Sequence, residues 1–289
     1  MTTILDGGIG QEIVRRYGDL NKVLWGIGVM AEAPEIVRAV HDDYFAAGAE
    51  IATTNSYNIH RDRFIRDGVP DQFDKLNRLA CEIAAESRDA HGAGLVAGSI
   101  GPLGGSYRPD RGNDFDEAAA GFEAVARGQA DIVDFYLLET VSSLDAARGA
   151  VAGTRVLGKP IWLAYSVDDY DGTILRSGES MADALALAIE LSVDAVLINC
   201  SRPEAVTQAV PLIKDAPMPT GAYANGFTHI TEAFKSDAPL ITDLSARTDL
   251  GPVEYAVHAE RWAADGAAMV GGCCEVGPAH IAELKRRLG

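Results

Sequence analysis

Two adjacent cysteines, Cys273 and Cys274, follow an apolar segment near the end of the chain, and Cys200 ends another such segment. Adjacent cysteines rarely bond each other, because a disulfide needs Cα atoms about 4.4–6.8 Å apart. Residues 195–198 and 267–270 read as buried strands, so the three thiols stand at or just past strand ends. Three sulfurs that converge on one point indicate a zinc site.

The number of sulfur ligands indicates the chemistry. Catalytic zinc sites keep one coordination position open, whereas structural sites usually close with four protein ligands. Three thiolates leave a position for a substrate sulfur, which coordination deprotonates and keeps nucleophilic. Such a thiolate attacks an electrophilic carbon, and a negatively charged centre favours a cationic donor. Trp25 and Tyr57 are candidates for holding that cation against an aromatic face.

Carboxylates and glycine amides suit the thiol substrate. Asp6 and Glu139 each follow a strand-like segment, and their carboxylates are candidates for binding an ammonium group. The backbone amides of Gly7 and Gly8 are candidates for binding a carboxylate. In these roles the two acidic side chains position the substrate and transfer no proton.

The elements that must position these residues alternate along the chain. Apolar strands separated by amphipathic helices are typical of a (β/α)8 barrel, and we predict one such domain over residues 1–289. A doubly wound open sheet is the alternative, but Gly7-Gly8-Ile9-Gly10 lacks the third glycine of a dinucleotide-binding loop. The predicted strands are residues 2–5, 50–54, 95–100, 132–138, 161–165, 195–198, 220–223 and 267–270.

Chemistry in such barrels takes place at the rim formed by the C-terminal ends of the strands. The unusual polar residues of this chain all fall at predicted strand ends, which supports the barrel over the open sheet. These residues are Asp6, Asn55, Glu139, Asn199, Cys200, Cys273 and Cys274.

Composition points to a small-molecule partner. The chain has 289 residues, a net charge of −17 and no stretch of apolar residues long enough to span a membrane. This charge argues against binding to nucleic acid or to an anionic membrane surface. No basic leader precedes an apolar core at the N-terminus, and we expect a cytoplasmic protein. A homo-oligomer is compatible with this composition.

Several short motifs together resemble the homocysteine S-methyltransferase family over about residues 3 to 286. The motifs are Asp6-Gly7-Gly8-Ile9-Gly10, Thr54-Asn55-Ser56-Tyr57, Gly98-Ser99-Ile100-Gly101-Pro102, Glu139-Thr140, Ile198-Asn199-Cys200 and Gly271-Gly272-Cys273-Cys274. The resemblance implies zinc bound by Cys200, Cys273 and Cys274, with homocysteine as the fourth ligand and methionine as the product. The substrate-binding residues that we predict are Asp6, Gly7, Gly8, Trp25, Asn55, Tyr57, Glu139, Thr140 and Asn199.

The resemblance leaves the methyl donor open. The chain looks similar to stand-alone enzymes that use S-methylmethionine or S-adenosylmethionine, and it is too short for folate and cobalamin modules. Betaine or another onium donor is the alternative. Gln11 and Glu275 depart from residues frequent in the family at positions expected at the edge of the pocket.

Proteins of other functional classes would require other residues or bonds at these positions. A non-catalytic zinc-binding or thiol-sensing barrel would have a closed fourth ligand or a disulfide between adjacent cysteines. A Schiff-base aldolase would need a lysine at a strand end, and none is predicted there. Cys81 lies on the apolar face of a predicted helix and is left out of the site.

Overall fold

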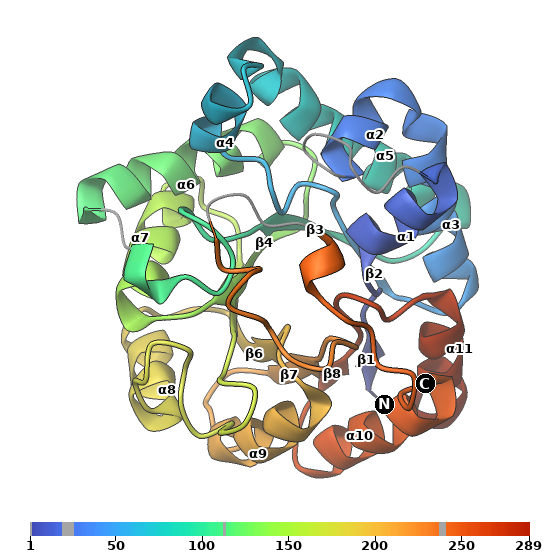
Figure 1. Ribbon diagram of the computed structural model, residues 1–289, viewed down its shortest axis with the longest axis vertical. Helices are drawn as coiled ribbons and strands as arrows, with labels where there is room; N and C mark the ends of the chain where they lie inside the picture. The colour runs from blue at the N-terminus through green and yellow to red at the C-terminus, as the bar shows by residue number, and fades with distance from the viewer. Residues whose placement is uncertain (1, 19–25, 112–113, 237–240) are drawn as a thin grey trace.

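The computed structural model describes residues 2–18, 26–111, 114–236 and 241–289 and shows a ring of parallel strands surrounded by helices (Figure 1). Eight strands form one sheet in the order β1-β8-β7-β6-β5-β4-β3-β2. A parallel bridge between Leu5 and Ile51 joins the two ends of this order, which confirms the predicted (β/α)8 barrel. The strands are β1 (Thr3–Ile4), β2 (Ile51–Thr53), β3 (Leu95–Ile100), β4 (Phe135–Val141), β5 (Ile161–Tyr165), β6 (Ala195–Asn199), β7 (Thr220–Tyr223) and β8 (Met269–Val270).

Helices cover the outer face of the barrel (Figure 1). They are α1 (Ile9–Tyr17), α2 (Gly26–Glu32), α3 (Pro34–Ala46), α4 (Arg61–Arg66), α5 (Phe73–His91), α6 (Phe115–Gln129), α7 (Leu144–Arg155), α8 (Met181–Glu190), α9 (Pro203–Ile213), α10 (Pro252–Ala264) and α11 (Pro278–Leu288). Short 3-10 helices are η1 (Pro70–Gln72), η2 (Pro109–Arg111) and η3 (Ile241–Asp243). Within the described ranges, no helix has the length and apolar character needed to cross a membrane.

Helix starts follow from local sequence. The Ser143 hydroxyl accepts a hydrogen bond from the Ala146 N–H, and the Ser180 hydroxyl accepts one from the Asp183 N–H. Each serine thereby satisfies an N–H group that the first helical turn leaves unpaired. Proline starts α3, α9, α10 and α11, where a missing N–H costs nothing.

The predicted boundaries of the fourth strand are wrong by three residues at each end. The N–H groups of Ile132 and Val133 donate to the Gln129 carbonyl and prolong the turn that ends α6, so β4 starts later. Glu139 and Thr140 therefore lie inside β4 rather than after it. The register with β5 shifts there, and Thr140 has a φ of 57°.

Two short helices are absent from the sequence-based prediction. Two glycines in helix α2 hide its helical pattern. Tertiary packing overrides this weak propensity, because Ile27, Val29 and Met30 are buried in the main core. Helix α4 is too short for its periodicity to be read from sequence.

Alternate residues along the strands point into the barrel. They form an interior cluster separate from the core between strands and helices. This cluster contains Leu5, Ile51, Ala97, Phe135, Leu137, Ala164, Ala195, Leu197, Tyr223 and Met269. Two residues further along, the same alternation turns Thr53, Ser99, Glu139 and Asn199 toward the C-terminal mouth. The barrel fold thus supplies a polar layer above a packed apolar interior.

A glycine-rich seam joins the ends of β1 and β8. The Gly272 N–H donates to the Asp6 carbonyl at 2.9 Å, and the Gly8 N–H donates to the Val276 carbonyl at 2.9 Å. A Cβ atom on Gly272 would lie 2.1 Å from Cγ1 of Val276, so only glycine fits there without displacement. This close approach places the segment that contains Cys273 beside Asp6.

We therefore predict that Gly272→Ala destabilises the protein by about 1–3 kcal/mol, because the added methyl group overpacks the buried Val276. Gly277→Ser in the same loop is the control. A Cβ atom on Gly277, which precedes α11, would make only an ordinary contact, 3.6 Å from Oε2 of Glu12, and serine is a favoured N-cap residue. Chemical denaturation measures both variants; equal stability of Gly272→Ala and the parent would contradict the prediction.

Candidate metal centre

The structure brings the three predicted sulfur ligands together at the C-terminal mouth of the barrel. Cys200 follows β6, and Cys273 and Cys274 lie in the loop after β8. The Sγ atom of Cys200 lies 2.7 Å from that of Cys273 and 3.9 Å from that of Cys274. All three Sγ atoms lie within 4.8 Å of one another.

This donor set fits a zinc ion. Zn–S bonds of about 2.3 Å in a tetrahedron place sulfurs about 3.8 Å apart, so only the Cys200–Cys273 pair must open, by about 1 Å. Soft thiolates select zinc over magnesium or calcium. Across the described residues, the cluster contains these three sulfurs and no fourth cysteine, histidine or carboxylate. The cysteines are free thiols, so the arrangement is neither a closed site nor a disulfide.

Backbone hydrogen bonds hold Cys200 and Cys273 in place. The Cys200 N–H donates to the Tyr223 carbonyl, and the Cys273 N–H donates to the Ala224 carbonyl. Cys200 has a φ of 48°, a conformation that costs free energy in a residue with a side chain. Such strain persists only where surrounding contacts enforce it, and here β6, β7 and β8 supply those contacts.

Two buried carboxylates face the same mouth. Asp6 accepts hydrogen bonds from the N–H and the hydroxyl of Thr53, at 2.6 and 2.7 Å. Glu139 accepts hydrogen bonds from the Ser99 hydroxyl and, at 3.0 Å, from the Tyr223 hydroxyl. Both carboxylates are therefore held in fixed orientations by neighbouring strands.

Burial controls the ionisation of this pair. Desolvation raises the pKa of Asp6 to about 8, although the hydrogen bonds from Thr53 oppose the shift and the charge of Glu139 adds to it. Desolvation also raises the pKa of Glu139 to about 7, against the hydrogen bonds from Ser99 and Tyr223. A bound cation would restore both groups to their ionised forms. The pair is thus an attractive site for an ammonium group.

Asn199 and Thr140 brace each other across the mouth. The Asn199 side-chain carbonyl accepts a hydrogen bond from the Thr140 N–H at 3.0 Å, and its amide donates to the Thr140 hydroxyl at 3.3 Å. These bonds hold Thr140 in its left-handed conformation at the irregular end of β4. Direct contact of either residue with substrate stays a prediction.

Tyr57 lies close to the metal centre. Its hydroxyl hydrogen-bonds with Ser106 at 2.8 Å and with Thr140, and its surroundings include Cys200. Asn55 instead points its amide at the Gly26 carbonyl, at 3.0 Å, and thereby ties the loop after β2 to α2. The structure therefore brings Tyr57 to the site and gives Asn55 a bracing contact.

The structure places the remaining predicted residues in different surroundings. The Gly8 N–H donates a hydrogen bond to the Val276 carbonyl, and its contact with a substrate carboxylate stays a prediction. Its close neighbour Gly7 stays a predicted binding residue. Trp25 lies outside the described residues. Cys81 is distant from the cluster and donates to the Asn77 carbonyl within α5.

Several residues of the site escape the sequence analysis. Ser99 and Tyr223, which hold Glu139, lie in or next to strand ends, where the inward alternation could have identified them. Tyr107 has no such signal because it lies in a turn-rich connection. Its hydroxyl is 3.0 Å from the Cys200 sulfur, and burial raises its pKa well above the usual range, which keeps it a neutral phenol.

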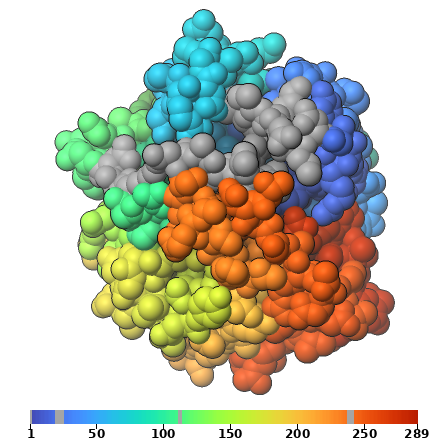
Figure 2. Space-filling model, in the orientation of Figure 1, coloured from blue at the N-terminus to red at the C-terminus, as the bar shows by residue number. Residues whose placement is uncertain are grey.

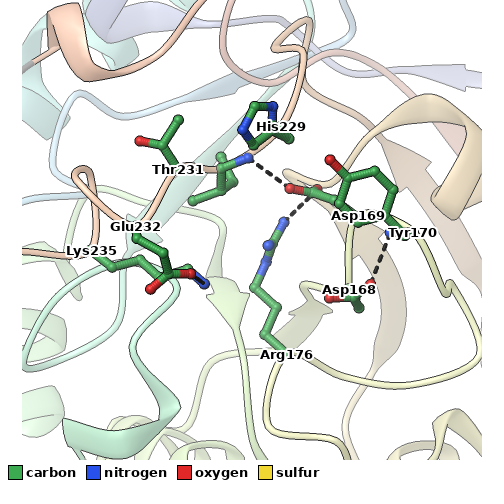
Figure 3. Close-up of a pocket in the computed structure, with 9 residues that line it drawn as sticks. Asp168, Asp169, Tyr170, Arg176, His229, Thr231, Glu232 and Lys235 are labelled. Carbon is green, nitrogen blue, oxygen red and sulfur yellow. Dashed lines mark hydrogen bonds and ion pairs between the residues drawn. The ribbon is translucent and has the colours of Figure 1, made fainter.

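A cavity of about 290 Å³ lies between the connections that follow β5 and β7 (Figure 3). Arg176 points toward Asp169 within it, and the two form a buried ion pair at 2.8 Å. Asp169 also accepts a hydrogen bond from the Ile230 N–H at 2.8 Å. The cavity lining is Asp168, Asp169, Tyr170, Arg176, His229, Ile230, Thr231, Glu232 and Lys235.

We expect the purified protein to bind one soft divalent metal ion. Replacing Cys200, Cys273 or Cys274 by serine should abolish stoichiometric binding, because a hydroxyl is a poor ligand for a soft metal ion. Cys81→Ala is the control, since Cys81 lies outside the cluster. Elemental mass spectrometry of dialysed samples measures the metal content. Full metal content in Cys273→Ser would contradict the site.

Comparison with known proteins agrees with this geometry. The family model described as homocysteine S-methyltransferase matches residues 3–288. The Escherichia coli (strain K12) homocysteine S-methyltransferase is 30% identical, over 98% of this chain and 94% of that protein. The Bacillus subtilis homocysteine S-methyltransferase YbgG is 27% identical, over 97% of this chain and 92% of that protein.

A solved structure shows the same architecture. The metallated form of the Escherichia coli homocysteine methyltransferase MmuM superposes with a TM-score of 0.83 at 28% identity, and the match covers 99% of this chain and 96% of that one. The family match therefore extends over nearly the whole barrel, including the three cysteines and both carboxylates. The chain belongs to the homocysteine S-methyltransferase family.

Proposed function

We propose that this protein transfers a methyl group from a sulfonium donor to the sulfur of homocysteine and so produces methionine. The observation that carries the proposal is the convergence of Cys200, Cys273 and Cys274 beside the buried pair Asp6 and Glu139. Three thiols and two buried carboxylates thus lie at one barrel mouth. Family membership supports homocysteine as the thiol substrate.

Asp6 and Glu139 bind the ammonium group of homocysteine in this proposal. Each carboxylate is already oriented by hydrogen bonds, so little conformational entropy is lost on binding. The ammonium group brings one positive charge to the two buried carboxylates, and the substrate is thereby oriented with its sulfur toward the cysteines. The Gly7 amide is the proposed partner of the substrate carboxylate.

The resident metal in this proposal is zinc, held by Cys200, Cys273 and Cys274. When bound, zinc supplies a means to keep the homocysteine sulfur deprotonated and nucleophilic at neutral pH. The residues of this chain hold the sulfur and the donor in line and exclude water. We place the reaction in the cytoplasm, where free thiols stay reduced.

The transfer step itself needs no proton at the reacting atoms. The homocysteine thiolate forms a bond to the methyl carbon, and the carbon–sulfur bond of the donor breaks. The electron pair of that bond stays on the donor sulfur, which becomes a neutral thioether. A cationic donor matches the negative charge of three thiolates, and the half-buried ring of Tyr57 is the proposed aromatic contact with the donor.

We predict methionine formation from homocysteine with S-methylmethionine or S-adenosylmethionine, and weaker or no formation with betaine. Chromatography of the products with each donor measures the difference; S-methylmethionine yields two methionines per transfer. Cys274→Ser is the negative control because it removes a proposed metal ligand. Turnover with betaine alone would overturn the sulfonium proposal, and turnover with none of these donors would overturn the proposed function.

A second prediction concerns pH. Protonation removes the negative charge of Glu139 and Asp6, whose pKa values burial raises to about 7 and about 8. The ratio kcat/KM for homocysteine reports the free enzyme and should therefore fall as the pH drops from 8.5 to 6.

The variant Glu139→Gln distinguishes the contribution of Glu139 from that of Asp6. It removes one charge-assisted hydrogen bond and should therefore raise KM for homocysteine about 10- to 100-fold. It should also remove the inflection near pH 7 from the pH profile of kcat/KM. Steady-state kinetics across this pH range provide the measurement. An unchanged KM in Glu139→Gln would exclude Glu139 as an ammonium ligand.

A further inference from the structure

Tyr107 lies against Cys200, the most buried cysteine of the metal centre. Its hydroxyl oxygen is 3.0 Å from the Cys200 sulfur, and its side chain is almost wholly buried. Its φ of 61° is a rare conformation for a bulky residue and persists only where the surroundings enforce it. The protein thus maintains a strained backbone at the residue that brings a phenol to a proposed metal ligand.

Residues from other connections hold the Tyr107 ring in place. The guanidinium carbon of Arg176 lies 4.6 Å from the ring centroid, and the Phe234 ring lies 6.1 Å away by centroid. Arg176 is itself fixed by Asp169 and by the Ser166 hydroxyl, each at 2.8 Å. Figure 3 shows Arg176 directed toward Asp169 from the connection after β5. The ring is therefore clamped by connections that follow β5 and β7.

In the hydrogen bond between Tyr107 and a metal-bound Cys200, only the phenol can be the donor. A metal-bound thiolate carries no proton and can only accept a hydrogen bond, whereas the neutral phenol of Tyr107 can donate one. The cation of Arg176 over the ring withdraws electron density and makes the phenol a better donor. Such contacts around ligands orient them and adjust how strongly they bind a metal.

We propose that Tyr107 is a positioning residue that donates a hydrogen bond to the Cys200 sulfur in the metal-bound protein. This bond removes negative charge from the thiolate, orients it, and slows release of the metal, while Arg176 clamps the phenol. The inference rests on the metal site of the proposed function. Tyr107 thus acts on the metal ligand Cys200 and does not touch the substrate.

Cobalt(II) bound in place of zinc is the probe, because its sulfur-to-cobalt charge-transfer absorption reports the charge on the thiolates. In Tyr107→Phe we expect this band to move to longer wavelength and cobalt transfer to a chelator to accelerate about 10-fold. Tyr136→Phe is the matched control. It removes a buried hydroxyl that bonds the Ala126 carbonyl at 2.9 Å, and it should behave like the parent.

An unchanged band and an unchanged release rate in folded Tyr107→Phe would overturn the proposal. If that variant does not fold, 3-fluorotyrosine at position 107 replaces it. This more acidic phenol should shift the band to shorter wavelength, and no shift would overturn the proposal. The cobalt experiment contains neither homocysteine nor a methyl donor. If the parent protein binds cobalt but forms no methionine in the donor assay, the proposed function alone is refuted.

Discussion

The seam between β1 and β8 is the contact on which the rest of the site depends. The Gly272 N–H binds the Asp6 carbonyl, while the Asp6 carboxylate is held by Thr53 of β2. One residue beyond Gly272 the chain presents Cys273. Because a side chain at Gly272 would collide with Val276, the strands approach closely only with glycine there. This contact between the first and last strands thus also sets the position of Cys273 relative to Asp6.

Buried acidic groups are the dominant property of the mouth. Removing an ion from water costs several kcal/mol unless a counter-charge accompanies it. Burial accordingly raises the pKa values of Asp6 and Glu139, and their hydrogen bonds offset this only in part. A metal ion and an ammonium group each relieve the imbalance, so the fold favours ligands that carry positive charge.

Aromatic and aliphatic side chains cover the sulfurs. Tyr107, Phe227 and Phe234 pack around Cys200 in a cluster apart from the barrel interior. Much of this cover comes from the connection between β7 and α10, drawn in orange at the centre of the face in Figure 2. Such a cover lowers the local dielectric and strengthens every charge interaction beneath it. The buried pair of Arg176 with Asp169 anchors the same connection through the N–H of Ile230.

The alternation of strands and helices, and the approach of three cysteines and two acidic residues at strand ends, can be predicted from sequence alone, because periodicity and strand ends are local properties. Only the tertiary structure decided where β4 ends, since its limits depend on a turn closed by Gln129 and on pairing with β5. It also engaged the Gly8 amide within the seam and brought Tyr107 to Cys200. These contacts join residues far apart in the chain, and local pattern carries no information on which distant groups will meet.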